Sequence, residues 1–214
     1  MKHEFWLKKW QDNQIGFHRS DVNPMLVKYV DRLNLSEGNR VFLPLCGKTL
    51  DIHGLLDRGF RVAGAELSET AVEQLFTELD IVPDISQKGA LKHYHGHKGQ
   101  DIDIFVGDIF ELDAQTLGDV HAVYDRAALV ALPPEMRKRY TAHLLSTTHK
   151  APQLLLCFEY DQSLRNGPPF SIPDHEVTEH YGAHYHLQCL ETHPVPGGIG
   201  GVDTEEKVWL LSSL

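Results

Sequence analysis

Short apolar runs alternate with segments of helical periodicity along most of the chain. Residues 41–45 have the pattern of a buried strand, residues 49–58 that of a helix with one apolar face, and residues 60–67 that of a second strand. Ser68 is a favourable helix N-cap, and residues 69–79 again place apolar side chains on one helical face. Because a single helix joins the two strands, they must run parallel. The pattern predicts an open α/β sheet.

The same alternation continues toward the C-terminus. Further strands are predicted at residues 102–106, 121–125, 153–158, 186–191 and 207–211, and further helices at residues 134–148 and 174–181. The polar segment 83–99 contains several glycines and is predicted as a surface excursion ending in a hairpin through residues 91–95. We predict a doubly wound α/β fold, with a seven-stranded, mostly parallel sheet that ends in a C-terminal antiparallel hairpin. The length favours one domain spanning residues 1–214.

The charged residues and cysteines argue against several classes of protein. The chain has 30 acidic and 20 basic side chains, a net charge of −10, which repels a nucleic-acid backbone. Cys46, Cys157 and Cys189 form no Cys-x-x-Cys pair, so neither a disulfide framework nor a structural zinc site is predicted. No stretch approaches the roughly 18 apolar residues of a membrane span. We expect a soluble, cytoplasmic monomer with no membrane or nucleic-acid partner.

Ligands of open parallel sheets bind beyond the carboxyl ends of the strands, so the residues that follow each strand are the candidates for a site. After the first strand, Pro44–Thr49 contains a single glycine and completes neither a dinucleotide motif nor a phosphate-binding loop. Glu66 ends the second strand, where a carboxylate can accept two hydrogen bonds from a ribose diol. Asp108 either faces an adenine edge or caps the next turn. This pattern favours an adenosine cofactor with a small charged appendage, which describes S-adenosylmethionine.

Several strings of residues are recognisable in combination and in order. They are Phe5–Trp6, Trp10–Asp12, Gly16–His18, Arg40–Lys48, Gly64–Glu66, Tyr124–Ala131 and Gly167–Phe170. Together they closely resemble the thiopurine S-methyltransferase family in its bacterial form, over nearly the whole chain. The resemblance implies a class I S-adenosylmethionine-dependent methyltransferase fold and methyl transfer to the sulfur of small aromatic or heterocyclic thiols such as thiopurines.

The resemblance also implies roles for individual residues. The cofactor would be bound by Trp10, Leu45, Glu66, Asp108, Ile109 and Arg126, while Phe17 would line the substrate side. Residues 1–20 would form a helical lid over the cofactor. Loop 195–203 departs from the family pattern because it is glycine-rich and has no arginine, which leaves the acceptor preference open.

Arg126 is the predicted catalytic residue. We expect its charge to favour the anionic form of the acceptor, while Trp10 and Phe17 close a dry cover over the reacting atoms. In the alternative for Arg126, the guanidinium pairs with Asp125 or belongs to a helix. In the alternative for Trp10, the helical stripe that it shares with Trp6 only packs on the body of the protein.

Three other functions stay open at this point. The main acceptor could be a selenium or tellurium species, or the chain could bind a nucleotide without methyl transfer. The fourteen histidines raise a third possibility, a metal-binding or pH-sensing protein. His93, His95 and His97 alternate on one face of a strand, and a second group contains His175, His180, His184 and His186. No carboxylate or cysteine in the sequence pattern completes the first group, so we predict a solvated hairpin tip and no metal.

Overall fold

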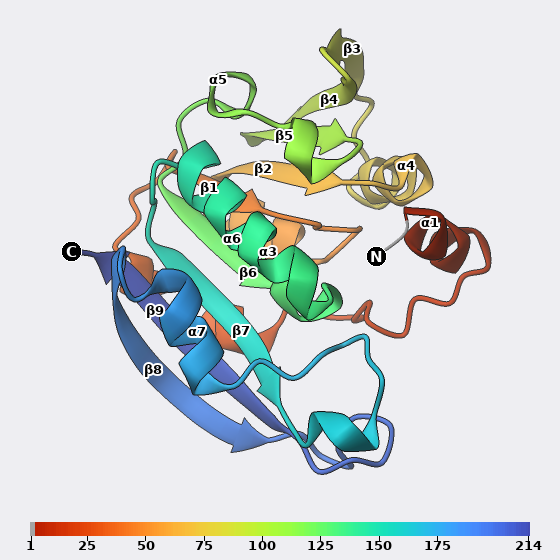
Figure 1. The fold of residues 1–214 in the computed structure, drawn as a ribbon. Coiled ribbons are helices and arrows are strands. Elements are labelled where there is room, and N and C mark those ends of the chain that lie inside the picture. The colour runs from red at the N-terminus through yellow and green to blue at the C-terminus, as the bar shows by residue number, and fades with distance from the viewer. Residues whose placement is uncertain (1–2) are drawn as a thin grey trace.

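The computed structural model describes residues 3–214, and Figure 1 shows a central sheet with helices on both faces. The nine strands lie in the order β3-β4-β5-β2-β1-β6-β7-β9-β8. Their bounds are β1 (Arg40–Leu43), β2 (Arg61–Glu66), β3 (Asp84–Lys88), β4 (Leu91–Lys98), β5 (Gln100–Val106), β6 (Ala122–Arg126), β7 (Gln153–Glu159), β8 (Tyr185–Pro194) and β9 (Glu205–Ser213).

The five central strands, β5, β2, β1, β6 and β7, run parallel. β1 pairs in parallel with both β2 and β6, so the chain winds outward in both directions from β1. β2 pairs with β5 and β6 with β7, also in parallel, while β9 and β8 form the antiparallel pair at the C-terminal edge. The predicted doubly wound α/β fold is confirmed.

The predicted strand number is wrong, because the sheet has nine strands and not seven. β4 is the first strand of the hairpin that was predicted through residues 91–95, and its antiparallel pairing with β5 confirms that hairpin. β3 lies in the part of segment 83–99 for which no strand was predicted. All five residues of β3 are exposed, so the strand buries no apolar side chain that would mark it in the sequence. It is held by antiparallel pairing to β4, an interaction that the alternation of apolar and polar residues does not reveal.

Helices cover the two faces of this sheet. Their bounds are α1 (His3–Gln11), α2 (Pro24–Tyr29), α3 (Asp51–Asp57), α4 (Glu69–Glu78), α5 (Ala114–Leu117), α6 (Pro134–Thr147) and α7 (Asp174–Tyr181), with short 3-10 turns η1 (Val30–Leu33), η2 (Ile109–Glu111), η3 (Leu129–Ala131) and η4 (Gln162–Leu164). One apolar core joins α2, α3 and α4 to the sheet, and a second core joins α5, α6 and α7 to the opposite face. None of the helices among residues 3–214 is long and apolar enough to cross a bilayer.

The helix boundaries follow from local hydrogen bonds. The Ser68 hydroxyl accepts from the Ala71 backbone N–H at 3.3 Å, which confirms the predicted N-cap of α4. α7 has the predicted bounds and α6 begins at Pro134 as predicted, a residue that suits a first helical turn. α1 lies beside α4 at the edge of the molecule, and the chain that follows it runs past the ends of the central strands (Figure 1). This path brings the N-terminal aromatic residues to the carboxyl end of the sheet.

Candidate active site

A cleft of about 830 Å³ opens at the carboxyl ends of β1, β2, β5 and β6. This is the position expected for a ligand site in a doubly wound sheet. The sequence-predicted site residues are brought together there, because the lining includes Trp10, Phe17, Leu45, Glu66, Asp108, Ile109 and Arg126. They come from six separate segments of the chain, and the fold gathers all of them around one space.

The loop after β1 turns sharply and forms the floor of the cleft. Leu45 and Gly47 both have positive φ angles, 48° and 55°. The Cys46 backbone N–H donates to the Ala65 carbonyl at 2.9 Å, which ties the loop to β2. Glycine suits position 47 because of its positive φ angle. It is also required by space, since a Cβ there would lie 2.9 Å from Cζ2 of Trp10. The indole of Trp10 therefore lies directly over this loop.

Glu66 places a buried carboxylate at the end of β2. The residue is 6% exposed, and its oxygens accept from the backbone N–H groups of Gly47 and Ser68, each at 2.8 Å. Burial raises the pKa of Glu66, while these backbone hydrogen bonds oppose the rise. A carboxylate has about four acceptor positions, so two are left for a ligand in the cleft. This geometry suits the two hydroxyls of a ribose.

Aromatic rings from the N-terminal segment cover one side of the cleft. Trp10 and Phe17 meet edge to face with ring centroids 5.5 Å apart, and Trp6 meets Phe17 in the same way at 5.7 Å. Trp10 is only 6% exposed. It thus packs on the body of the protein and lines the cleft at once, so the two interpretations of the tryptophan stripe do not exclude each other.

Arg126 extends from the end of β6 toward this cover. Its Nη2 donates to the Phe17 carbonyl oxygen at 3.2 Å. The alternative ion pair with Asp125 is wrong, because that carboxylate accepts from the Leu129 backbone N–H at 3.1 Å and from the Tyr140 hydroxyl at 2.7 Å. The positive charge of Arg126 is therefore left to act on the cleft.

Asp108 and Ile109 form the wall that follows β5. One Asp108 oxygen accepts from the Phe110 backbone N–H at 3.0 Å and so caps η2, which confirms the turn-capping interpretation. The other oxygen lies 3.4 Å from Nε2 of His3. Ile109 is 7% exposed and presents an apolar surface to the cleft. Both residues line the cleft.

Comparison with known proteins identifies the family. A family model described as thiopurine S-methyltransferase (TPMT) matches residues 1–210. The chain belongs to the thiopurine S-methyltransferase family. It is 54% identical over 213 residues to the thiopurine S-methyltransferase of Xanthobacter autotrophicus, and the match covers 99% of both chains. It is 50% identical to the thiopurine S-methyltransferase of Teredinibacter turnerae, and that match covers 99% of this chain and 98% of the relative.

Solved structures extend the similarity of fold to more distant methyltransferases. The 1,6-didemethyltoxoflavin-N1-methyltransferase of Burkholderia thailandensis, solved with S-adenosylhomocysteine, has a TM-score of 0.66 at 15% identity, over 99% of this chain and 87% of that chain. The magnesium protoporphyrin IX methyltransferase of Synechocystis, also solved with S-adenosylhomocysteine, has a TM-score of 0.66 at 14% identity, over 99% of this chain and all of that one. The fold is that of the S-adenosylmethionine-dependent methyltransferases.

Two residues of this thiopurine S-methyltransferase family chain line the cleft without having been predicted. Asp51 is 1% exposed and Tyr124 is also buried. Within residues 3–214, Oδ2 of Asp51 and the Tyr124 hydroxyl make no hydrogen bond of good geometry. They are not isolated from each other, because burial and the nearby Asp51 carboxylate both raise the pKa of Tyr124. Sequence patterning could not find them, because Asp51 starts a helix and Tyr124 lies within a core strand.

Arg165 is a third lining residue that sequence analysis missed. Its Nη2 donates to the Pro168 carbonyl at 3.1 Å, and its Nε would lie 3.1 Å from a Cβ at Gly200. The side chain therefore packs over the glycine-rich loop that has no arginine of its own. Its Nη1 is buried and has no partner among residues 3–214. A neighbouring loop thus supplies the basic group that loop 195–203 does not have.

His18 adds an imidazole to the same side of the cleft. Burial lowers the pKa of His18, and the nearby charges of Lys48 and Arg126 lower it further. The side chain is therefore a neutral imidazole at neutral pH, able to accept a proton.

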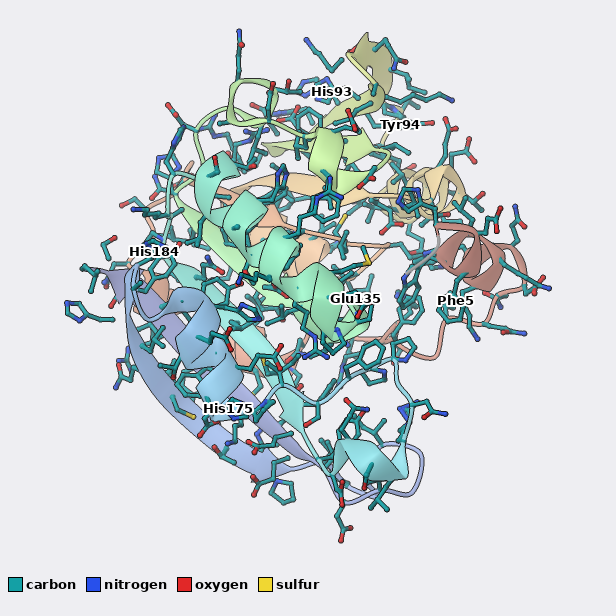
Figure 2. All side chains as sticks on the ribbon, in the orientation of Figure 1. Phe5, His93, Tyr94, Glu135, His175 and His184 are labelled. Atoms are coloured by element: carbon teal, nitrogen blue, oxygen red, sulfur yellow. The ribbon has the colours of Figure 1, made fainter. Side chains whose placement is uncertain are left out.

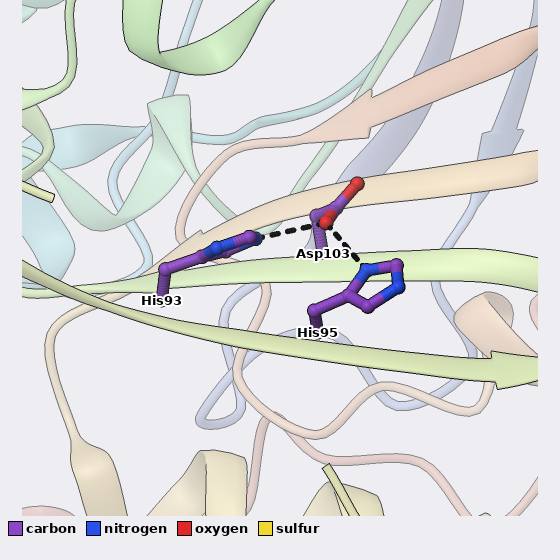
Figure 3. Close-up of side chains that lie close together, drawn as sticks. All are labelled: His93, His95 and Asp103. Carbon is purple, nitrogen blue, oxygen red and sulfur yellow. Dashed lines mark hydrogen bonds and ion pairs between the residues drawn. The ribbon is translucent and has the colours of Figure 1, made fainter. Parts of the chain in front are cut away.

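The prediction for the first histidine group is wrong in one respect. His93 is not at a solvated hairpin tip, and a carboxylate does complete the group: Oδ1 of Asp103 lies 2.8 Å from Nε2 of His93 and 2.9 Å from Nδ1 of His95 (Figure 3). Asp103 was read as part of an alternating strand, and only the antiparallel pairing of β4 with β5 brings it opposite His95. His97 lies apart, on Asp101.

The second histidine group is not brought together as a ligand set. His180 lies 3.3 Å from Glu176, one helical turn away. Figure 2 shows His175 and His184 on the part of the molecule that carries α7 and β8, well away from His93. Among residues 3–214, His93, His95 and Asp103 are the only three such donors within 4.8 Å of one another.

Proposed function

We propose that this chain is an S-adenosylmethionine-dependent methyltransferase that methylates the sulfur of small aromatic or heterocyclic thiols such as thiopurines. Membership of the thiopurine S-methyltransferase family supports the activity, and the fold supports the cofactor. The observation that carries the proposal is the Glu66 carboxylate, buried at the end of β2 with two acceptor positions left for a ligand.

The residues of the cleft fit this cofactor from end to end. We assign the ribose hydroxyls to Glu66 and the adenine to the wall formed by Asp108 and Ile109. Leu45 would contribute its backbone and Trp10 its indole face, since the indole lies over the β1 loop. Each of these assignments uses a group that lines the cleft.

The polar end of the cofactor fits the buried polar groups of Asp51 and Tyr124 in the cleft. The Oδ2 atom of Asp51 would accept from the ammonium group, and the Tyr124 hydroxyl would donate to the carboxylate. Arg126 lines the same cleft, and we assign it to this end of the cofactor and to the acceptor. An acid and a hydroxyl side by side could bind the ammonium and carboxylate groups of an amino acid.

The N-terminal segment is proposed as a lid within a single domain of residues 1–214. The proposed lid spans residues 1–20, of which the first two lie outside the described residues. Trp10 and Phe17 of this segment line the cleft, and their rings contact each other. Excluding water in this way strengthens every electrostatic interaction below the lid.

The chemical step is an in-line displacement that positioning alone can accelerate. When bound, S-adenosylmethionine supplies an electrophilic methyl group on a positively charged sulfur. Arg126 favours the thiolate form of the acceptor by its charge, and Phe17 lines the acceptor side. The thiolate lone pair forms the new S–C bond while the old C–S pair returns to the donor sulfur. An acceptor that arrives as a thiol gives its proton to His18 or to water.

Arg165 extends this proposal to the choice of acceptor. Together with Arg126 it places two guanidinium groups around one mostly apolar space. Acceptors that carry an anionic group next to an aromatic ring suit such a site, because guanidinium binds carboxylate with paired hydrogen bonds. Selenium and tellurium species remain the alternative acceptors and belong in the same assay.

We also propose that the protein acts as a cytoplasmic monomer on a small-molecule acceptor. Cys46, Cys157 and Cys189 are all free, as suits a reducing compartment. The net charge of −10 disfavours nucleic acid as a substrate. Sedimentation of the purified chain would test its oligomeric state.

Ligand binding and turnover test the proposal directly. S-adenosylmethionine and its demethylated product should raise the melting temperature, and NAD should not, because only a ligand of the folded state stabilises it. Labelled methyl groups should then pass to members of a panel of thiols, selenols and tellurite. Absence of stabilisation by either adenosyl ligand would overturn the proposal.

A second experiment isolates Arg126. Arg126→Ala should lower turnover of an ionisable thiol most strongly at the acid end of a profile from about pH 6 to about pH 9, where the thiolate is scarce. Unchanged turnover across that range would remove the electrostatic role.

A further inference from the structure

Three potential ligands lie together on the β4–β5 hairpin, outside the cleft. Oδ1 of Asp103 is 2.8 Å from Nε2 of His93 and 2.9 Å from Nδ1 of His95, and Figure 3 shows both rings directed at this one carboxylate. None of the three lines the cleft. Asp103 lies four residues before Gly107, about 13 Å along an extended strand from the end where the cleft opens.

The distances from Oδ1 of Asp103 to the two imidazole nitrogens suit a small transition-metal ion. Zn²⁺ binds imidazole nitrogen at about 2.0–2.1 Å and carboxylate oxygen at about 2.0–2.2 Å, so ligand atoms in a tetrahedral site are about 3.3 Å apart. The two contacts that Asp103 makes are shorter than this by about half an ångström. Two imidazoles and one carboxylate form a borderline-soft donor set that prefers zinc to magnesium or calcium.

The surroundings hold the three side chains in place. Nη2 of Arg40 donates to the other Asp103 oxygen at 2.7 Å, which fixes the carboxylate plane and leaves Oδ1 for the imidazoles. The His93 ring stacks on Phe105 with centroids 4.8 Å apart, and its Nδ1 lies 3.5 Å from the Ser86 hydroxyl. Metal-binding histidines commonly use their second nitrogen in this way, to fix the ring and its tautomer.

The site is sheltered but open to solvent on one side. The side chains of His93 and Asp103 are 15% and 17% exposed, whereas that of His95 is 42% exposed. Metal ligands must offer a lone pair, and the carboxylate of Asp103 is held with Oδ1 toward both rings. Water can enter past His95 and supply a fourth ligand.

We propose that His93, His95 and Asp103 form a Zn²⁺ site with water as the fourth ligand, separate from the methyltransferase cleft. Binding needs the tautomers in which each ring hydrogen lies on the nitrogen away from the ion. That nitrogen is Nδ1 of His93, 3.5 Å from the Ser86 hydroxyl, and Nε2 of His95. The ion links β4 to β5. It binds Oδ1 of Asp103, while Arg40 keeps its hydrogen bond to Oδ2.

Zinc titration of the full chain after EDTA treatment tests this site. Isothermal titration with ZnCl₂ should give one ion per chain, and MgCl₂ should give no saturable heat. His95→Ala should weaken zinc binding at least about tenfold, as expected for loss of a ligand. This variant keeps the contacts of Asp103 with His93 and Arg40, so the fold should persist.

His97→Ala is the matched control. His97 lies on the same strand and meets a carboxylate at the same distance, 2.9 Å from Asp101, but belongs to no group of three potential ligands among residues 3–214. The control should bind zinc like the unaltered chain and show the same rise in melting temperature with zinc, a rise that His95→Ala should lose.

Failure to bind zinc at one ion per chain would overturn the proposal. Unchanged binding by His95→Ala, or equal weakening by the two alanine variants, would place the ion elsewhere among the surface histidines and would also overturn it. S-adenosylhomocysteine binding measured in EDTA is independent of this site, so either proposal can fail without the other.

Discussion

Replacing Gly47 by alanine tests whether Trp10 is seated over the β1 loop as the structure shows. Two separate costs arise at this position. The φ angle of 55° is left-handed, which costs a residue with a Cβ about 1–2 kcal/mol. The new Cβ would also lie 2.9 Å from Cζ2 and 3.2 Å from Cη2 of Trp10, closer than ordinary contacts. The indole must therefore move by roughly half an ångström or strain the loop.

Gly89→Ala provides the matched control, because it places a Cβ at a left-handed φ angle without creating a close contact. Its φ angle is 60°, and nothing lies within 4 Å of the added Cβ. Gly89→Ala should therefore lose about 1–2 kcal/mol of unfolding free energy. Gly47→Ala should lose about 1–3 kcal/mol more, the usual cost of overpacking a filled space. The difference between the two variants isolates the contact with Trp10.

Cofactor affinity gives a second measurement of the same contact. An aromatic contact is worth about 0.5–1.5 kcal/mol, so displacing the indole should raise the Kd for S-adenosylhomocysteine by about twofold to about tenfold. Gly89→Ala should leave this Kd unchanged. Urea unfolding and isothermal titration of both variants supply the numbers. If the two variants lost equal stability and bound S-adenosylhomocysteine equally well, Trp10 could not lie over Gly47 as a cover for the cofactor.

Three further predictions address individual side chains. Glu66→Gln should weaken S-adenosylhomocysteine binding by about 2–4 kcal/mol, because two hydrogen bonds to a charged acceptor become hydrogen bonds to a neutral one. The binding of an analogue without the ribose hydroxyls should not be weakened by this substitution. Burial raises the pKa of Asp125 from 3.8 to about 6, so the native state binds this proton more tightly than the unfolded chain does. The ionised form therefore costs about 3 kcal/mol above about pH 6, and this cost disappears as the pH falls toward about 4. Urea unfolding of the unaltered chain and of Asp125→Asn should give free energies of unfolding whose difference changes by this amount between about pH 4 and about pH 6. If the two free energies changed with pH in parallel, the raised pKa of Asp125 would be contradicted. Arg165→Ala should raise KM for a carboxylate-bearing aromatic thiol by about tenfold while leaving that of a neutral thiol unchanged, and equal effects on both would refute an electrostatic role.

The sequence predicted the residues whose position depends on chain order. Glu66 is a good example, because the end of a parallel strand at the switch point is fixed once the strand and its two neighbours are recognised. The same holds for Arg126 at the end of β6. The period of the apolar pattern gave the strands, and the rule for parallel sheets placed their carboxyl ends along one edge. Family resemblance then supplied the expected roles.

Residues whose position depends on contacts between distant segments could not be predicted in this way. Arg165 reaches the cleft by packing over Gly200, a contact across two loops that no periodic pattern encodes. Tyr124 has the pattern of an ordinary core residue, and only its position in the lining of the cleft, beside Asp51, sets it apart. Asp103 joins its histidines through strand register, which a polar hairpin specifies weakly in sequence.

The contacts around the cleft join the cofactor side to the acceptor side without a gap. The Glu66 carboxylate holds the Gly47 N–H, Trp10 lies over Gly47, Phe17 meets Trp10, and the Phe17 carbonyl accepts from Arg126. A ribose bound at Glu66 therefore stabilises the loop on which the aromatic cover is seated. That cover in turn holds the guanidinium that we propose acts on the acceptor. Because one set of contacts positions both reactants, cofactor binding should precede productive acceptor binding, and the collinear arrangement needed for methyl transfer is assembled before the thiolate arrives.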